Sequence, residues 1–440
     1  MRCWPNSSRT RESRPAEFAR SAARMGMRTS GLTSDFWRSV ASVLTGTAVA
    51  QAIPIAGSLV IARQYAPTDF GRFSAWLGLV LVVAVALTGR FETALALEPD
   101  GEPRRRAVVS TLLTAALVAV LLAGASAVAV VIWPAWLEHE STPLVAAFFP
   151  VALLIAMGQT WQSWAAAEGR YRDLSMMRIA EAAAITTSQI ALGAAFASAG
   201  SLAIAHLIGV MVGLAVSARL LPIHWPAGNP APMVREFWSR HRRFPLLSLP
   251  ADVLNTASAQ LPVLIVAGRF GAETAGLLAL AMRTLGAPIG ILGKSVLDVF
   301  KRHAATSYRE RGECRADYLR TFRVLATGSL GVAIVLALWS APLFALAFGE
   351  AWRGAGTIAA WLVPMFALRF VSSPLSYMVY IAGKQHLDLV WQACLLGMTL
   401  ASLNLFSHHA AAIIAYSAGY SLLYIVYLMM SYRFSLGDRR

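Results

Sequence analysis

Runs of roughly 20 apolar residues recur along this chain from residue 40 to residue 431, and few charges interrupt them. A helix needs about 20 apolar residues to cross the hydrocarbon core of a bilayer. In lipid, only helices or closed barrels satisfy all their backbone polar groups. The runs are continuous rather than alternating, which excludes barrel strands. The sequence therefore predicts an all-α polytopic membrane protein.

Twelve segments of this kind can be placed along the chain, and a Pro-rich basic stretch at 222–243 divides them into six and six. We therefore expect twelve transmembrane helices in two six-helix lobes around a central cavity. The expected spans are 40–62, 73–97, 107–132, 144–166, 178–198, 202–221, 244–268, 273–300, 324–348, 355–381, 389–406 and 410–431.

The expected units follow from these spans. They are a disordered basic N-terminal tail (1–35), an N-lobe with the first six helices (36–221), a cytoplasmic linker (222–243), a C-lobe with the last six helices (244–432) and a cytoplasmic tail (433–440).

The charges indicate how the chain is oriented. The formal net charge of +15 would suggest nucleic-acid binding in a soluble protein. However, 30 of the 38 Lys and Arg residues fall on one side of the predicted membrane and four on the other. Such an asymmetry follows the positive-inside rule and places both termini in the cytoplasm. We therefore expect contact with membrane lipid and no nucleic-acid partner.

The two lobes resemble each other weakly. Residues 61–76 ("IARQYAPTDFGRFSAW") and 266–281 ("VAGRFGAETAGLLALA") align without gaps at an offset of 205, so that Gly71 meets Gly276. In transporters built from such repeats, substrate sites lie between the halves near the membrane midplane. The repeat thus points to a site between the lobes.

Four cations fall inside predicted spans: Arg90, Arg283, Lys294 and Arg369. A charge at the bilayer centre costs about 2.5–3.5 kcal/mol on insertion scales, so it normally faces protein or water. Arg283 and Arg369 lie near the centres of their spans. Arg90 and Lys294 lie closer to the cytoplasmic ends, from where a long side chain can reach the interface.

The segment 273–300 carries a polar stripe. Arg283, Gly290, Lys294 and Asp298 follow spacings of 7, 4 and 4 and therefore share one helical face. This stripe suits a water-filled cavity. For Lys294 and Asp298, the alternative is an i,i+4 ion pair at a helix end.

Acidic residues accompany the cations. Because Arg90 and Glu92 are two residues apart, they point to different sides of a helix, and we expect no mutual ion pair. Glu92 either anchors the span at the cytoplasmic interface or takes part in ion coupling. Asp252, in a Pro-interrupted polar segment, is either an ion- or proton-coupling acid or the structural cap of a broken helix.

Other polar residues in the predicted spans are expected to form interhelical hydrogen bonds. They are Gln159, Gln162, Glu181, Gln189 and His206. No phosphate-binding loop, zinc-protease motif, nucleophile elbow or metal-spaced His/Cys set occurs in the sequence, and its three cysteines are scattered. We therefore expect no catalytic residue, no metal and no cofactor.

Three stretches resemble a known family. They are "LTGTAVAQAIPIAGSLVIARQYAPTDFGRFSAW" (44–76), "GRFETALAL" (89–97) and the segment 242–300 beginning "RRFPLLSLPADVLNTASAQLP". In this order they resemble the O-antigen (Wzx-type) flippases, polysaccharide exporters of the multidrug/oligosaccharidyl-lipid/polysaccharide (MOP) superfamily. Lys294 departs from the family, which often has an uncharged polar residue there.

The resemblance implies a transporter of the bacterial inner membrane and not an enzyme. It implies V-shaped inward and outward states around a cationic cavity, and a polyprenyl-diphosphate-linked glycan as substrate. Arg90, Arg283, Lys294 and Arg369 would then hold the diphosphate. The glycan is destined for O-antigen, capsule or exopolysaccharide, and polysaccharide polymerase and chain-length machinery are the implied protein partners.

Three alternatives remain open from the sequence. A multidrug or small-metabolite antiporter of the same superfamily usually needs acidic residues in its cavity, whereas the central charges here are basic. A polytopic glycan polymerase or ligase would need a sizeable external loop, which the sequence does not offer. A scaffold that binds lipid without transporting it is the third.

Overall fold

The computed structural model describes residues 46–132, 142–225 and 229–437. The tail expected at 1–35 lies outside these residues, as do positions 438–440 of the expected C-terminal tail. Within helix α8, the side chains of Lys294 and Asp298 also lie outside the description.

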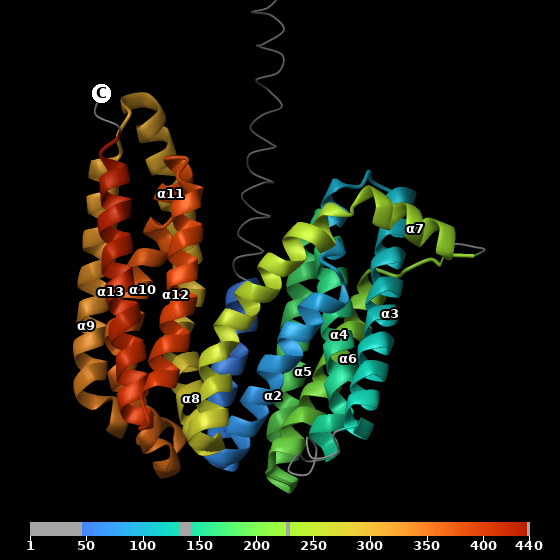
Figure 1. Cartoon of the computed structure of the whole chain (residues 1–440), viewed down its shortest axis with the longest axis horizontal. Helices are drawn as coiled ribbons and strands as arrows, with labels where there is room; N and C mark the ends of the chain where they lie inside the picture. Colours follow the sequence, from blue (N-terminus) through green and yellow to red (C-terminus); the bar gives the residue numbers. More distant parts are fainter. Residues whose placement is uncertain (1–45, 133–141, 226–228, 438–440) are drawn as a thin grey trace, which may run out of the picture.

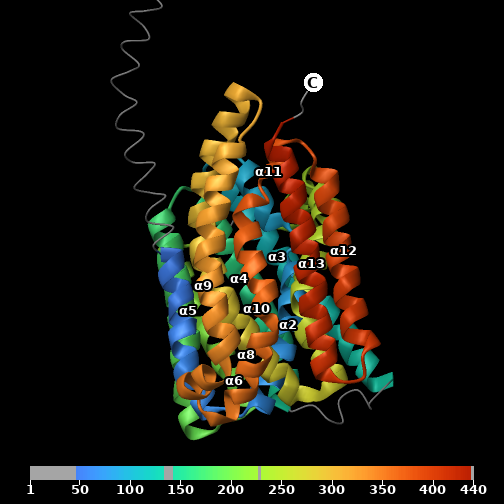
Figure 2. The same ribbon diagram turned by 90° about the vertical axis from the view of Figure 1, so that its left-hand side faces the viewer.

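The described chain is α-helical, and its long helices run roughly parallel to one another (Figure 2). The long helices are Gly46–Gln64, α2 (Pro67–Leu87), α3 (Glu102–Ile132), α4 (Thr142–Ala167), α5 (Tyr171–Ala195), α6 (Ala199–Leu220), α8 (Leu249–Arg311), α9 (Arg315–Phe348), α10 (Arg353–Leu375), α12 (Gln385–Leu405) and α13 (His409–Ser435). The short ones are η1 (Phe91–Leu97), α7 (Ala231–Arg240), η3 (Phe244–Ser248), η4 (Glu350–Trp352) and α11 (Met378–Ile381).

Within the described residues, ten helices are long and apolar enough to cross a membrane, which confirms an all-α polytopic membrane protein. Helix α8 counts once among them although it covers two of the predicted spans. Its 63 residues contain one non-helical residue, Gly271, with φ 89° and ψ 165°. Helix α5 is not among the ten, since charged and polar residues interrupt its apolar sequence.

The helices form two bundles that converge at one end of the molecule and diverge at the other (Figure 1). Helices α3 to α6 belong to one bundle and α9 to α13 to the other. Helix α2 packs along α8 where the bundles meet. The main apolar core crosses this junction, because it includes Phe70 of α2, Leu278 of α8 and Trp352 of η4.

A contact between two glycines joins the bundles at the convergent end. A Cβ on Gly71 would lie 2.7 Å from the backbone nitrogen of Gly276 and would overlap the Ala272 carbonyl. A Cβ on Gly276 would lie 2.9 Å from the nitrogen of Gly71 and would overlap the Pro67 carbonyl. The two halves of this contact are related by the offset of 205 between the aligned segments, in keeping with the internal repeat.

Polar contacts close the same end. The Arg63 guanidinium donates a hydrogen bond to the Leu346 carbonyl at 2.9 Å. The Trp352 indole donates to the Ala62 carbonyl, and its ring meets Phe70 edge-on with centroids 5.5 Å apart. The end opposite this junction carries α7 and the C-terminus (Figure 1).

The expected span 73–97 is wrong at its C-terminal end. Helix α2 ends at Leu87, and Gly89 and Arg90 follow in the left-handed region with φ 60° and 62°. A right-handed helix cannot continue through two such residues. The 3₁₀ turn η1 therefore replaces the last part of the expected helix, which changes the direction in which Arg90 and Glu92 point.

We expect Gly71→Ala to destabilise the junction by about 1–3 kcal/mol, the usual cost of overpacking a tight contact. The obstacle at this position is backbone, which cannot yield without separating α2 from α8. Thermal unfolding of the purified protein in detergent measures the effect.

The matched control is Gly124→Ala in α3, where an added Cβ meets nothing within 4 Å. This substitution replaces a helical glycine in open space and should leave stability unchanged or slightly higher. Equal melting temperatures for the two variants would contradict the proposed role of the glycine contact.

Candidate functional site

Arg90 forms a charge cluster with two acids, contrary to the expectation for a continuous helix. Its Nη1 lies 2.9 Å from Oε1 of Glu92, and its Nε lies 2.7 Å from Oδ2 of Asp252 at the start of α8. The left-handed backbone of Arg90 turns its side chain towards both carboxylates. The cluster carries two negative charges and one positive charge, so it offers no free cation to an anionic ligand.

Burial within this cluster is uneven. The Glu92 side chain is 3% exposed, Arg90 24% and Asp252 36%. Neither carboxylate oxygen of Glu92 accepts a hydrogen bond within the described part of the chain, so the ion pair with Arg90 is what balances its charge. A carboxylate this buried is not an anchor at the membrane surface. Asp252 joins the start of α8 to the segment after α2 rather than capping its own helix.

Arg283 lies where α8 meets the first described helix. This half-buried guanidinium donates a hydrogen bond from Nη2 to the Pro54 carbonyl at 3.0 Å. On the same face of α8, a Cβ on Gly290 would lie 2.9 Å from Oε1 of Gln51. The two described members of the predicted stripe, Arg283 and Gly290, therefore face the first described helix, and Arg283 bridges the two halves of the chain.

Arg369 differs from the other two arginines. Its side chain is exposed on α10 although it lies deep within a membrane-length segment. No carboxylate of the described side chains lies within ion-pair distance of it. Its guanidinium lies 6.0 Å from the centroid of the Phe366 ring and lines a cavity of about 210 Å³ with three serines, Ser372, Ser373 and Ser376.

The predicted site residues do not form a single cluster. The structure brings Arg90, Glu92 and Asp252 together, holds Arg283 at the interface between the halves, and places Arg369 within the C-terminal bundle. Lys294 belongs to α8 by its backbone, and its side chain lies outside the description.

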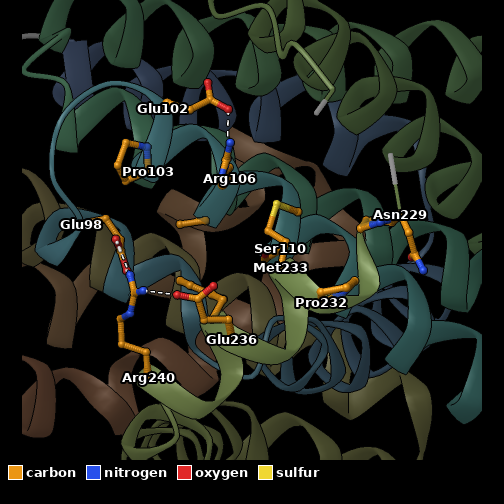
Figure 3. Close-up of a pocket in the computed structure, with 13 residues that line it drawn as sticks. Glu98, Glu102, Pro103, Arg106, Ser110, Asn229, Pro232, Met233, Glu236 and Arg240 are labelled. Atoms are coloured by element: carbon orange, nitrogen blue, oxygen red, sulfur yellow. Dashed lines mark hydrogen bonds and ion pairs between the residues drawn. The ribbon is translucent and has the colours of Figure 1, made fainter. Parts of the chain in front are cut away.

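A larger pocket of about 590 Å³ lies between the start of α3 and α7 (Figure 3). Helix α7 lies at the divergent end (Figure 1). Both arginines of the pocket are paired with glutamates. Arg106 pairs with Glu102 at 3.1 Å, and Arg240 pairs with Glu236 and with the buried Glu98. This pocket therefore attaches the linker helix to the N-terminal bundle and presents no unpaired cation to a phosphate.

The expected interhelical hydrogen bonds are found only in part. Gln162 donates to Glu181 at 3.2 Å and accepts from Arg178 at 3.1 Å. At Gln189, the Tyr65 hydroxyl donates to the backbone carbonyl at 2.9 Å, and no hydrogen bond of the Gln189 side chain is found within the described residues. His206 has a buried Nδ1 without a hydrogen-bond partner in the described structure. No such bond involves the Gln159 side chain within the described residues.

The sequence did not single out the aromatic and polar lining of the cavity next to Arg369. The signal was present, because α13 carries Tyr416, Tyr420, Tyr424 and Tyr427 at spacings of 4, 4 and 3. On α12, Asp388 precedes Trp391 and Gln392 by three and four residues, so that all three share one face. Nor did the sequence single out Arg178, the first residue of the expected span 178–198, whose guanidinium donates to Gln162 and Thr47.

Comparison with known proteins identifies the family. The model of the family described as polysaccharide biosynthesis protein matches residues 60–356, which is more than half of the chain. The chain belongs to this family. No curated protein matches the sequence. The family resemblance expected from the three sequence stretches is thus confirmed.

Solved structures of low sequence identity share the fold of this polysaccharide biosynthesis protein. The lipid II flippase MurJ in an inward closed conformation is 12% identical, with a TM-score of 0.70 over 89% of this chain and 87% of that chain. An inward-facing multidrug resistance MATE family transporter of the MOP superfamily is 13% identical, with a TM-score of 0.64 over 88% and 94%. The MATE multidrug transporter DinF-BH is 15% identical, with a TM-score of 0.58 over 90% and 94%.

The chain therefore shares its fold with these transporters of the MOP superfamily.

We expect Arg90→Ala to destabilise the protein by about 1–3 kcal/mol, because it leaves the buried carboxylate of Glu92 without a partner. The double variant Arg90→Ala/Glu92→Gln should recover part of this loss, since it removes the unpaired charge. Thermal unfolding in detergent measures both variants.

Arg106→Ala is the matched control for this test. It breaks an ion pair whose two side chains are both 58% exposed, and such a pair contributes about 0–1 kcal/mol. If Arg90→Ala unfolds at the same temperature as this control, the cluster has no structural role.

Proposed function

We propose that this protein translocates an undecaprenyl-diphosphate-linked oligosaccharide repeat unit across the bacterial inner membrane. The unit would serve the biosynthesis of a surface polysaccharide, namely O-antigen, capsule or exopolysaccharide. Membership of the polysaccharide biosynthesis protein family supports this proposal, and the fold shared with a lipid II flippase agrees with it. Polysaccharide polymerase and chain-length machinery are the partners that such a unit would require.

The exposed Arg369 carries the proposal. Placing an arginine in a membrane segment with no acid beside it costs free energy unless its charge contacts water or an anionic ligand. Guanidinium groups make bidentate, charge-assisted hydrogen bonds to phosphate. Asp388 lines the same cavity but lies beyond ion-pair distance of Arg369, so a lipid-linked diphosphate would supply the direct anionic partner that the guanidinium lacks among the described side chains.

Arg283 is the second proposed ligand of the diphosphate. Its bond to a backbone carbonyl leaves the guanidinium charge uncompensated by any carboxylate of the described side chains, so a phosphate can take its place. We propose Lys294, which follows Arg283 on the same predicted face of α8, as a third ligand of the diphosphate. Arg90 would bind the diphosphate only after its ion pair with Asp252 has broken, because Glu92 and Asp252 both pair with it in this structure.

The transport cycle follows from the two bundles. We propose two lobes of six spans each, 36–221 and 244–432, joined by the linker at 222–243, with α5 and both halves of α8 as separate spans. Both termini would lie in the cytoplasm. The bundles diverge at the end that carries α7 (Figure 1), and with α7 on the cytoplasmic side this would correspond to an inward-facing state. Rocking of the lobes would carry the headgroup across while the polyprenyl chain stays in lipid.

Asp252 and Glu92 are the proposed coupling acids. Protonation of Asp252, the more exposed of the two, would remove its attraction for Arg90 and free α8 from the segment after α2. Opening of this pair would couple a proton, or a sodium ion that competes with Arg90, to the movement of the lobes.

A multidrug or small-metabolite antiporter is the second candidate, since solved multidrug transporters share the fold. Glu92 and Asp252 would be the acids that such an antiporter needs. Both are paired with Arg90, however, so this cluster presents no free carboxylate to a cationic drug. The arrangement of charges therefore favours an anionic substrate.

We expect Arg283→Gln and Arg369→Gln to abolish surface glycan in a complemented deletion strain. The loss of a charge-assisted hydrogen bond costs about 1.5–3 kcal/mol, or roughly 10- to 150-fold in affinity. Undecaprenyl-linked repeat units should accumulate in the inner leaflet, which lipid extraction and mass spectrometry would quantify.

Arg353→Gln serves as the control, because Arg353 is 52% exposed at the convergent end and pairs with Glu350. Its glycan display should equal that of the wild type. Normal display by both Arg283→Gln and Arg369→Gln, at wild-type protein levels, would refute the assignment.

A further inference from the structure

The cavity next to Arg369 has the lining of a sugar-binding site. Its volume is about 210 Å³, and it lies between α10, α12 and α13, with Tyr380 of α11 at its edge. Besides Arg369, Ser372 and Ser373 of α10 and the C-cap residue Ser376, it is lined by Asp388, Trp391 and Gln392 of α12 and by Tyr424 and Tyr427 of α13. Each of these helices contributes a hydroxyl, amide, carboxylate or aromatic group.

One wall of this cavity is a fixed aromatic cluster. The ring of Trp391 lies 4.5 Å from that of Tyr427 and 5.5 Å from that of Tyr424, between centroids. The indole N–H donates to the Leu423 carbonyl at 3.2 Å, which holds the ring in place. Aromatic faces carry negative charge density, so they attract the weakly positive C–H groups on the face of a pyranose ring.

The cavity also provides hydrogen-bond acceptors and donors for sugar hydroxyls. Oδ1 of Asp388 accepts a hydrogen bond from the Tyr427 hydroxyl at 3.0 Å, and no cation of the described side chains pairs with this carboxylate. A carboxylate has room for several further hydrogen bonds. Gln392 is exposed and can both donate and accept.

The volume decides how much ligand the cavity can hold. The cavity volume is about 210 Å³. It lies below the range of roughly 300–1,000 Å³ that is typical of pockets for drug-sized ligands. The cavity is therefore suited to one small polar ring rather than to an oligosaccharide.

We propose that this cavity binds the single pyranose ring attached directly to the diphosphate of the lipid-linked glycan. The inference rests on the proposed function and adds a subsite in the C-terminal bundle. Arg369 lies at the same cavity, so it receives the phosphate while Trp391 packs against the neighbouring sugar and Asp388 and Gln392 bind its hydroxyls. The subsite distinguishes a loaded carrier lipid from the bare diphosphate that remains after the glycan has been transferred.

Binding of two lipids to the purified full-length protein tests this subsite by native mass spectrometry. One probe is undecaprenyl diphosphate, and the other is the same lipid bearing one sugar. The sugar is glucose, galactose, N-acetylglucosamine or N-acetylgalactosamine, whichever gives the lipid that the wild type binds most tightly. We expect the wild type to bind the sugar-bearing lipid more tightly. Trp391→Ala and Gln392→Ala should each weaken that binding at least tenfold and leave binding of the bare lipid within twofold.

Two further variants separate recognition from folding. Trp391→Phe keeps an aromatic face and should bind the sugar-bearing lipid within threefold of the wild type. Trp339→Ala removes a tryptophan that is 53% exposed on α9 and should alter neither lipid. Because the Gln392 side chain is exposed, its truncation leaves the packing of α12 intact.

The possible results separate the two proposals. The subsite is refuted if the wild type does not discriminate between the lipids, or if Trp391→Ala and Gln392→Ala lose both lipids equally or neither. If the wild type binds neither lipid, the proposed function itself fails. If Arg369→Gln weakens both lipids while Trp391→Ala weakens only the sugar-bearing one, both proposals stand.

Discussion

The close approach of two backbones at Gly71 and Gly276 is the constraint on which the arrangement of the molecule depends. Each glycine occupies the space that a side chain on the other helix would need. Because lipid provides little hydrophobic driving force between helices, such small-residue contacts are a main source of their association. The two bundles thus meet at a point where the backbone allows no substitution, and they diverge from it. The equivalent residues 67 and 272 complete the contact symmetrically.

The partners of the charged residues follow from this geometry. The convergent end is closed by hydrogen bonds to backbone carbonyls, and the Arg90 cluster and Arg283 connect α8 to the N-terminal half. These arginines have protein partners, which reduces the cost of holding a cation in the membrane. Arg369 has a ring and hydroxyl groups around it and no carboxylate of the described side chains within ion-pair distance. The difference separates arginines that bond to the other half of the chain from one that lines a cavity within a single bundle.

An anionic lipid headgroup fits this division of roles. In the proposed cycle, ion pairs and hydrogen bonds between the halves would exchange for bonds to phosphate as the lobes rock. The aromatic cavity of the C-terminal bundle does not depend on the junction, because all of its walls come from α10 to α13. A sugar could therefore remain bound to one bundle while the contacts between the bundles change.

The sequence by itself determined the membrane class, the approximate positions of the helices, the related glycines and the presence of cations within spans. These properties depend on composition and local spacing, because burial in lipid acts on each segment separately. Only the tertiary structure decided which cations are free. Asp252 reaches Arg90 from 162 positions away because the left-handed residues at 89 and 90 end α2 early. Likewise, Arg369, Asp388 and Tyr427 share one cavity only because α10, α12 and α13 pack together, and no local pattern specifies which faces of distant helices will meet.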